Sequence, residues 1–149
     1  MTTEGEFRRE DSLGYMVNLL GRLFARALDR RLGKYGVAHG QFPVLLILWE
    51  QEGITQSEIA RRLDIEQPTV ANTLKRMERD DLVTFAADPG NRRQVLIGLT
   101  EKGRALKTPL IAEALAVNDR AVEDFEAADR VQFIARLRRM IDALSGPAE

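Results

Sequence analysis

A pair of short helical segments joined by a brief connection constrains the fold of this chain more than any other feature. The first opens on Thr55-Gln-Ser-Glu58, a capping box typical of a helix start, and continues with apolar residues on one side. Asp64 and Ile65 form the connection, and Pro68 suits the first turn of the second helix. One apolar stripe runs along that helix, formed by Val70, Leu74 and Met77. Two helices joined by a tight turn predict a helix-turn-helix.

From Leu82 the spacing of apolar residues changes to every second residue, which indicates β-strands. One strand begins at Leu82 and the other covers residues 95–99. Between them lies Asp88-Pro-Gly-Asn91, in which proline and glycine suit the central positions of a type II turn. The pattern predicts a hairpin, or wing, that carries Arg92 and Arg93 at its tip.

Helices are predicted on both sides of this central region. A long amphipathic helix starts at Asp11 or Ser12 and ends near Gly33, and a buried helix runs from Pro43 to Glu50. Thr100 caps a helix that Pro109 bends, and a last helix follows Asp124 and stops at Gly146-Pro147. The predicted fold class is mainly α with a small β-hairpin wing.

Composition excludes several chemistries. The 149 residues, 44% hydrophobic and 30% charged, suit a globular domain. No cysteine and a single histidine, His39, exclude disulfides, thiolate metal sites and multi-histidine centres. There is no glycine-rich phosphate loop either, and Glu50 and Glu52 are interpreted as the solvated end of a helix. We therefore expect no catalytic residues, no metal, no cofactor and no enzymatic activity.

The sequence gives no sign of a membrane segment. The longest apolar run, residues 44–49, is far below the roughly 20 residues that cross a bilayer. The amino terminus, MTTEGEFRRE, has no apolar signal region. We expect a soluble, cytoplasmic protein that does not bind membranes.

The placement of charge, rather than its total, points to DNA. Twenty-two basic and 23 acidic residues give a net charge of −1, which neither favours nor excludes a nucleic-acid partner. A helical wheel places a polar face opposite the apolar stripe of the second helix, formed by Pro68, Asn72, Lys75, Arg76 and Arg79. Asparagine can pair with adenine in the major groove and basic side chains reach phosphates, although an ordinary solvated face has the same pattern.

The wing arginines also allow two interpretations. Arginine on a narrow arm suits the minor groove, whose negative potential attracts it. Alternatively, Asp88 braces one of Arg92 and Arg93 while the other lies in solvent. Both can hold together, with one arginine stiffening the wing and the other contacting DNA.

The combined motifs resemble the MarR family of winged helix-turn-helix regulators. The stretch ITQSEIARRLDIEQPTVANTLKRMERDDLVTFAADPGNRRQVLIGLTEKG matches its DNA-binding lobe, and QFPVLLIL matches the preceding helix. The resemblance spans roughly residues 12–145 and implies a homodimer on double-stranded DNA, with a recognition helix in each major groove and a wing in each flanking minor groove. It divides the single MarR-like domain, 1–149, into a helical dimerisation lobe, 11–33 and 101–146, and a winged helix-turn-helix DNA-binding lobe, 40–100.

The resemblance also assigns DNA-contacting residues. One departure concerns Asn91, because the family often has an aspartate just before the wing arginines, so that the stiffening salt bridge depends on Asp88. The positions that match base-proximal, backbone-contacting and wing residues are, in that order, Gln67, Pro68, Thr69, Asn72 and Thr73; Lys75 and Arg76; and Arg92 and Arg93.

Members of this family commonly bind small aromatic or phenolic anions where the dimerisation helices meet the DNA-binding lobe. An alternative is that the corresponding residues here are simply core, because aromatic residues at helical spacing usually pack. The material for such a pocket is Tyr15, Leu19, Leu23, His39, Phe42 and Trp49.

The function expected from these patterns is a ligand-responsive transcriptional regulator, a repressor, that binds a pseudo-palindromic operator as a homodimer. The alternative is a winged-helix module that binds proteins and responds to no ligand. Such a module would carry an exposed apolar patch on residues 68–79, where this chain has polar residues.

Overall fold

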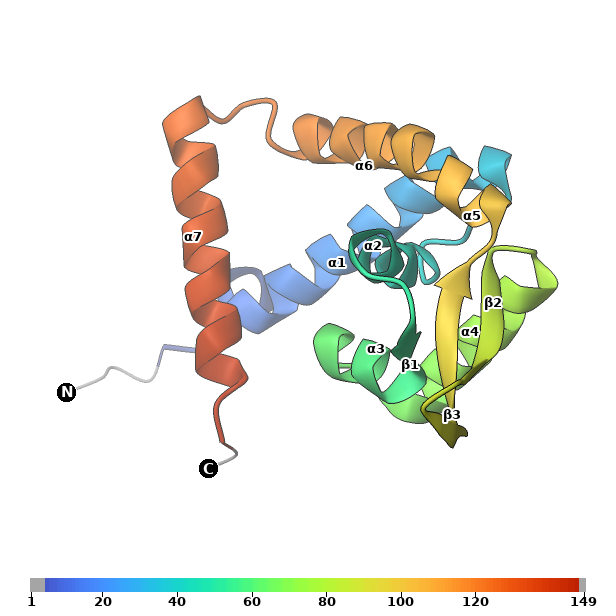
Figure 1. Ribbon diagram of the computed structural model, residues 1–149. Coiled ribbons are helices and arrows are strands. Elements are labelled where there is room, and N and C mark those ends of the chain that lie inside the picture. Colours follow the sequence, from blue (N-terminus) through green and yellow to red (C-terminus); the bar gives the residue numbers. More distant parts are fainter. Residues whose placement is uncertain (1–4, 148–149) are drawn as a thin grey trace. The chain divides into compact units, whose positions relative to one another are not determined.

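The computed structural model describes residues 5–147, and its architecture is mainly helical with one small antiparallel sheet (Figure 1). The sequence-based fold class is therefore correct. The chain divides into two compact units, one ending at Ala114 and the other beginning at Leu115. The helices are α1 (Leu13–Leu32), α2 (Phe42–Glu50), α3 (Gln56–Leu63), α4 (Gln67–Arg79), α5 (Glu101–Ala105), α6 (Lys107–Ala121) and α7 (Ala127–Leu144), with short 3-10 turns η1 (Arg9–Asp11) and η2 (Gly33–Tyr35). The strands are β1 (Ile54–Thr55), β2 (Val83–Asp88) and β3 (Asn91–Leu99).

The helix-turn-helix forms where predicted, although the capping box is only half made. The Thr55 side chain accepts a hydrogen bond from the Glu58 N–H at 3.2 Å. The Glu58 carboxylate does not reach back to Thr55 and instead binds Arg61 and Arg62 at 2.6 and 2.8 Å. The Thr55 side chain thus satisfies one backbone N–H in the first turn of α3, and the Glu58 carboxylate forms ion pairs with arginines of the next turn.

Asp64 makes the turn between α3 and α4. Its φ of 51° is left-handed, and the Ile65 N–H donates to the Ala60 carbonyl at 3.1 Å, which is the Schellman pattern. The chain leaves α3 in a new direction after Asp64, and α4 begins only three residues later at Gln67.

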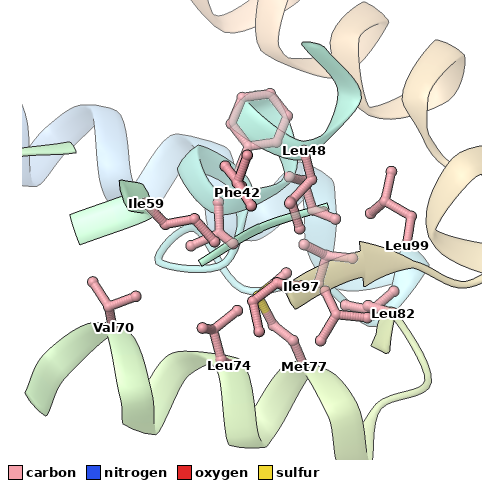
Figure 2. Close-up of a cluster of buried hydrophobic side chains, with 14 of the residues drawn as sticks. Phe42, Leu48, Ile59, Val70, Leu74, Met77, Leu82, Ile97 and Leu99 are labelled. Carbon is pink, nitrogen blue, oxygen red and sulfur yellow. The ribbon is translucent and has the colours of Figure 1, made fainter. Parts of the chain in front are cut away.

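One hydrophobic core holds α4 in place (Figure 2). Figure 2 shows Val70, Leu74 and Met77 pointing from α4 toward residues of α3 and the sheet, among them Ile59 and Ile97. All three side chains of the predicted stripe are at most 2% exposed. Burial of each contributes about 1.5–3 kcal/mol, which outweighs the weak helix propensity of the β-branched residues in α4. The opposite face of α4 is consequently turned outward.

The sheet has the strand order β1-β3-β2, and all its neighbouring strands are antiparallel. The third strand, β1, was not predicted, because two residues carry no periodic signal. Val83 pairs with Leu99 and Ala87 with Val95, but Asp88 pairs with Asn91. The register therefore shifts at the wing tip, and residues 92–94 of β3 form a bulge without partners on β2.

The predicted type II turn at the wing tip is wrong. A type II turn needs a left-handed conformation at its third residue, here Gly90. The structure has positive φ only at Gly36 and Gly53 among its described glycines. Instead, the Asp88 carboxylate accepts a hydrogen bond from the Gly90 N–H at 2.9 Å, so a local side-chain contact sets the turn.

The predicted bent helix after Thr100 is two helices. The regular helix is interrupted at Leu106, between α5 and α6 and three residues before Pro109, although the Leu106 backbone stays in the right-handed helical region. A proline ring clashes with the carbonyl four residues earlier, here that of Ala105, which explains why the interruption precedes Pro109. In the second unit, α7 has the predicted extent, and Phe125 packs edge-on against Phe133 with ring centroids 5.8 Å apart.

No helix among residues 5–147 is long and apolar enough to span a bilayer.

Candidate nucleic-acid interface

The outward face of α4 presents the side chains that the sequence places there. Asn72, Lys75 and Arg76 are exposed and make no side-chain hydrogen bond or ion pair with any other described residue. Pro68 and Thr69 are exposed in the first turn of the helix. This face therefore offers an amide and two unpaired cations to a partner.

Two other predicted contacts are held by the protein itself. The Thr73 hydroxyl donates to the Thr69 carbonyl at 3.0 Å, and the side chain is half-buried. The Gln67 Oε1 accepts from the Ser57 hydroxyl at 3.3 Å, which ties the start of α4 to α3. Ser57 was not among the predicted site residues, because only the packing of two helices brings the pair together.

The wing carries two more cations, in the bulge at residues 92–94. Arg92 and Arg93 are exposed, and no carboxylate of the described residues lies within ion-pair distance of either. The proposed brace from Asp88 is therefore wrong: one oxygen of that carboxylate accepts from the Gly90 N–H, and neither oxygen pairs with a wing arginine. Asn91 supplies a substitute, since its Oδ1 accepts from the Arg93 N–H at 3.1 Å and orders the backbone while leaving the guanidinium unpaired.

The end of α4 is fastened by the segment that follows β3. The Thr100 hydroxyl donates to the Asp81 carbonyl at 2.6 Å, and Lys102 Nζ donates to the Asp80 carbonyl at 2.9 Å. Gly103 lies so close to Leu82 that a Cβ there would overlap the Leu82 carbonyl oxygen. Residues of the LTEKG stretch therefore hold the connection between α4 and β2 in place.

Glu52 has a structural role that the sequence analysis missed. Its carboxylate accepts from Arg104 Nε and Nη2 at 3.0 and 2.9 Å and from the Leu99 N–H at 2.8 Å. The Arg104 hydrogen bonds, followed by that from Leu99, lower the pKa of Glu52. Glu52 is therefore no solvated helix end: it joins the α2–β1 loop to β3 and α5.

The residues predicted to bind a ligand fall into three groups. Phe42 and Trp49 pack edge-on with centroids 6.0 Å apart, and Trp49 Nε1 donates to the Gly103 carbonyl at 2.9 Å. His39 is exposed, and its Nδ1 lies 2.7 Å from the Asp29 carboxylate, within hydrogen-bond distance. The remaining three lie along α1, where Tyr15 and Leu23 are exposed and Leu19 is half-buried.

Together, the buried stripe of α4, its free polar face and the adjoining basic hairpin define the class of winged helix-turn-helix proteins. The family model described as "MarR family" matches residues 37–95. The chain is 39% identical over 98 residues to the HTH-type transcriptional regulator TtmR of Methylorubrum extorquens, an alignment that covers 66% of this chain and 50% of TtmR. It is 33% identical over 98 residues to the organic hydroperoxide resistance transcriptional regulator of Bacillus subtilis, covering 66% of this chain and 67% of that one. This chain belongs to the MarR family.

Solved structures agree with this assignment over nearly the whole chain. The complex of Staphylococcus aureus MepR with DNA has a TM-score of 0.81 at 25% identity, covering 89% of this chain and 98% of MepR. A structure of Bordetella bronchiseptica BpsR, concerned with the regulation of its DNA binding by 6-hydroxynicotinic acid, has a TM-score of 0.84 at 25% identity and covers 93% and 99%. The chain spans only half the length of TtmR. These relatives are regulators and not enzymes.

Proposed function

We propose that this protein is a transcriptional regulator that binds double-stranded DNA as a homodimer and represses the genes next to its operator. The observation that carries the proposal is the unpaired state of Asn72, Lys75 and Arg76 on one outward helix face. Basic side chains contact phosphate oxygens and an asparagine amide pairs with a base edge, and on this face no carboxylate of the described residues competes for them. The wing arginines extend that face toward a flanking minor groove.

Exposed apolar side chains support the homodimer. On α1, Leu13 and Leu23 are 64% and 47% exposed, and on α7 Val131 and Ile141 are 71% and 62% exposed. A soluble chain rarely leaves whole helical stripes uncovered, and a second copy would bury them. The dimerisation lobe would comprise residues 11–33 and 101–146, and the DNA-binding lobe residues 40–100. Two recognition helices about 34–36 Å apart would then meet half-sites of a pseudo-palindrome.

Regulation by a small aromatic anion is the second part of the proposal. It is supported by BpsR, whose DNA binding is regulated by 6-hydroxynicotinic acid. The candidate lining is Tyr15, Leu19, Leu23, His39, Phe42 and Trp49, and His39 already lies against Asp29 at the end of α1. A ligand there would act by favouring one spacing of the recognition helices, and a tenfold loss of DNA affinity requires about 1.4 kcal/mol of coupling.

The test uses a duplex that the unsubstituted protein selects from a random pool. Asn72→Ala should cost about 1–3 kcal/mol at its contacted base pair and relax the sequence preference there. Lys75→Ala should weaken all duplexes alike and reduce the salt dependence by about one unit.

Fluorescence anisotropy at several salt concentrations measures both effects. Lys107→Ala removes an exposed charge from α6 and serves as the control that leaves binding unchanged. Binding that survives both α4 substitutions intact would place the DNA surface elsewhere.

A further inference from the structure

Gln41 is the one buried polar side chain in the described part of the chain, at 6% exposure. It lies immediately before α2, where its carbonyl accepts the Leu45 N–H and caps that helix. Both ends of its amide are used. Oε1 accepts from the Ala38 N–H at 3.1 Å, and Nε2 donates to Asp80 Oδ2 at 3.1 Å. A buried amide with both ends bonded holds two segments in one relative position, because losing either partner leaves a desolvated group.

The partner of Gln41, Asp80, is the C-cap of α4 and directly follows its last residue, Arg79. The other carboxylate oxygen of Asp80 accepts from Arg79 Nε at 3.4 Å, and Arg79 belongs to the polar face of α4. The hydrogen bond from Gln41 is the largest cause that lowers the pKa of Asp80. Asp80 is therefore a charged acceptor, and a hydrogen bond to a charged group is stronger than one between neutral groups.

The loop that carries Gln41 is fastened to α1 at its other end. Asp29, in the last turns of α1, accepts both the His39 N–H and a hydrogen bond with the His39 ring, each at 2.7 Å. The Val37 N–H donates to the Leu32 carbonyl at 3.3 Å. A continuous series of hydrogen bonds thus runs from α1 through residues 37–41 to the end of α4.

We propose that Gln41 is a positioning residue for DNA recognition, which holds the end of α4 through Asp80 and couples the orientation of that helix to α1. The inference rests on the proposed function, since it assigns α4 as the recognition helix. A helix held at its C-cap keeps a defined angle, and base contacts at Asn72 depend on that angle, whereas phosphate contacts tolerate small rotations. Losing the link should therefore reduce discrimination between duplexes more than general DNA affinity.

The experiment exchanges the charge between the two partners. Gln41→Glu sets a second carboxylate against that of Asp80, and we expect a loss of about tenfold or more in affinity for the selected duplex, with little loss on a scrambled one. Asp80→Asn alone should change discrimination little, because the introduced amide can turn its oxygen toward Gln41. The double variant, Gln41→Glu with Asp80→Asn, restores one donor and one acceptor and should recover the discrimination of the unsubstituted protein.

Affinities are measured on protein shown to be folded by circular dichroism, so that a change of stability alone does not alter the ratio of affinities for the selected and scrambled duplexes. Full discrimination by folded Gln41→Glu, or a folded double variant that discriminates no better than Gln41→Glu, overturns the proposal. If Gln41→Glu does not fold, the folded double variant provides the test. Discrimination equal to that of the unsubstituted protein supports the role of the Gln41–Asp80 contact, and a loss of discrimination refutes it. An unsubstituted protein that selects no duplex would instead refute the proposed function, and this inference with it.

Discussion

Gly103 is a position where three segments of the chain approach too closely for any side chain larger than a hydrogen atom. Its N–H donates to the Thr100 hydroxyl at 3.0 Å, and its carbonyl accepts from Trp49 Nε1. The residue is buried against Leu82, with no room for a Cβ. Three segments, α2, the α4–β2 connection and α5, therefore meet at one glycine.

We expect Gly103→Ala to destabilise the protein by about 1–3 kcal/mol, because the added methyl group must displace backbone rather than a flexible side chain. Urea unfolding followed by circular dichroism measures the loss. Gly40→Ala is the matched control, since nothing lies within 4 Å of a Cβ at that position. Equal stability of the two variants would contradict the close approach at Leu82.

The carboxylate of Glu58 gives a pH prediction. Hydrogen bonds from Arg61, and then from Arg62, lower its pKa from 4.5 to about 2. A group whose pKa is lower in the folded state stabilises the fold above its unfolded pKa and loses that effect as the pH falls. The contribution of Glu58 should therefore be complete above about pH 4.5 and disappear toward pH 2.

Unfolding of the unsubstituted protein and of Glu58→Gln at pH 7 and pH 3 measures this effect. The stability difference between the two proteins should be larger at pH 7 and shrink at pH 3. It should be small throughout, because exposed pairs are screened by solvent. A difference that grows on acidification would contradict the assignment.

At the scale of elements, the wing owes its shape to polar contacts rather than to packing. Its base is anchored by Val83 and Ile97, which are buried, whereas Val95 farther along is 49% exposed. Beyond Val95 the strands lose their register, and Asp88 and Asn91 order the tip through backbone N–H groups. The bulge leaves the arginines unpaired at the end of a narrow arm.

We expect the double substitution Arg92→Ala with Arg93→Ala to weaken DNA binding and to reduce the salt dependence by up to about two units, one for each phosphate that is no longer neutralised. Anisotropy titrations from low to high salt measure the slope. Lys107→Ala with Arg120→Ala removes the same charge from exposed positions on α6 and controls for net charge. An unchanged slope in the wing variant would exclude the arginines from the interface.

For the whole molecule, the exposed apolar side chains of α1 and α7 bear on the oligomeric state. Their exposed apolar residues predict an obligate dimer at micromolar concentration, which sedimentation tests directly. Ile141→Asp should unfold the protein rather than release folded monomers, because an obligate dimer often has no stable monomeric fold. Gln132→Asp, on the polar side of α7, is the control expected to remain dimeric. A stable folded monomer of the unsubstituted chain would refute the dimer.

The local periodicity of apolar residues determined which face of each main element is buried and which is exposed. Val70, Leu74 and Met77 recur at helical spacing, and a helix with such a stripe buries it and turns Asn72 and Lys75 outward whatever it packs against. The same holds for the alternation of β2 and β3 and for the caps Ser12, Thr55 and Thr100. The core face and the outward face of the candidate site follow from these short-range patterns.

Tertiary structure alone decided the contacts between segments distant in the sequence. Glu52 binds Arg104, 52 residues away in the sequence, and Gln41 binds Asp80, 39 residues away. No periodicity or motif spacing in the sequence indicates either pair. The pairing of β1 with β3 and the bulge at residues 92–94 likewise appear only when the strands come together. Periodicity specifies which side of an element is apolar, whereas the partner of each polar group depends on which surfaces meet, and that is settled only when the whole core packs.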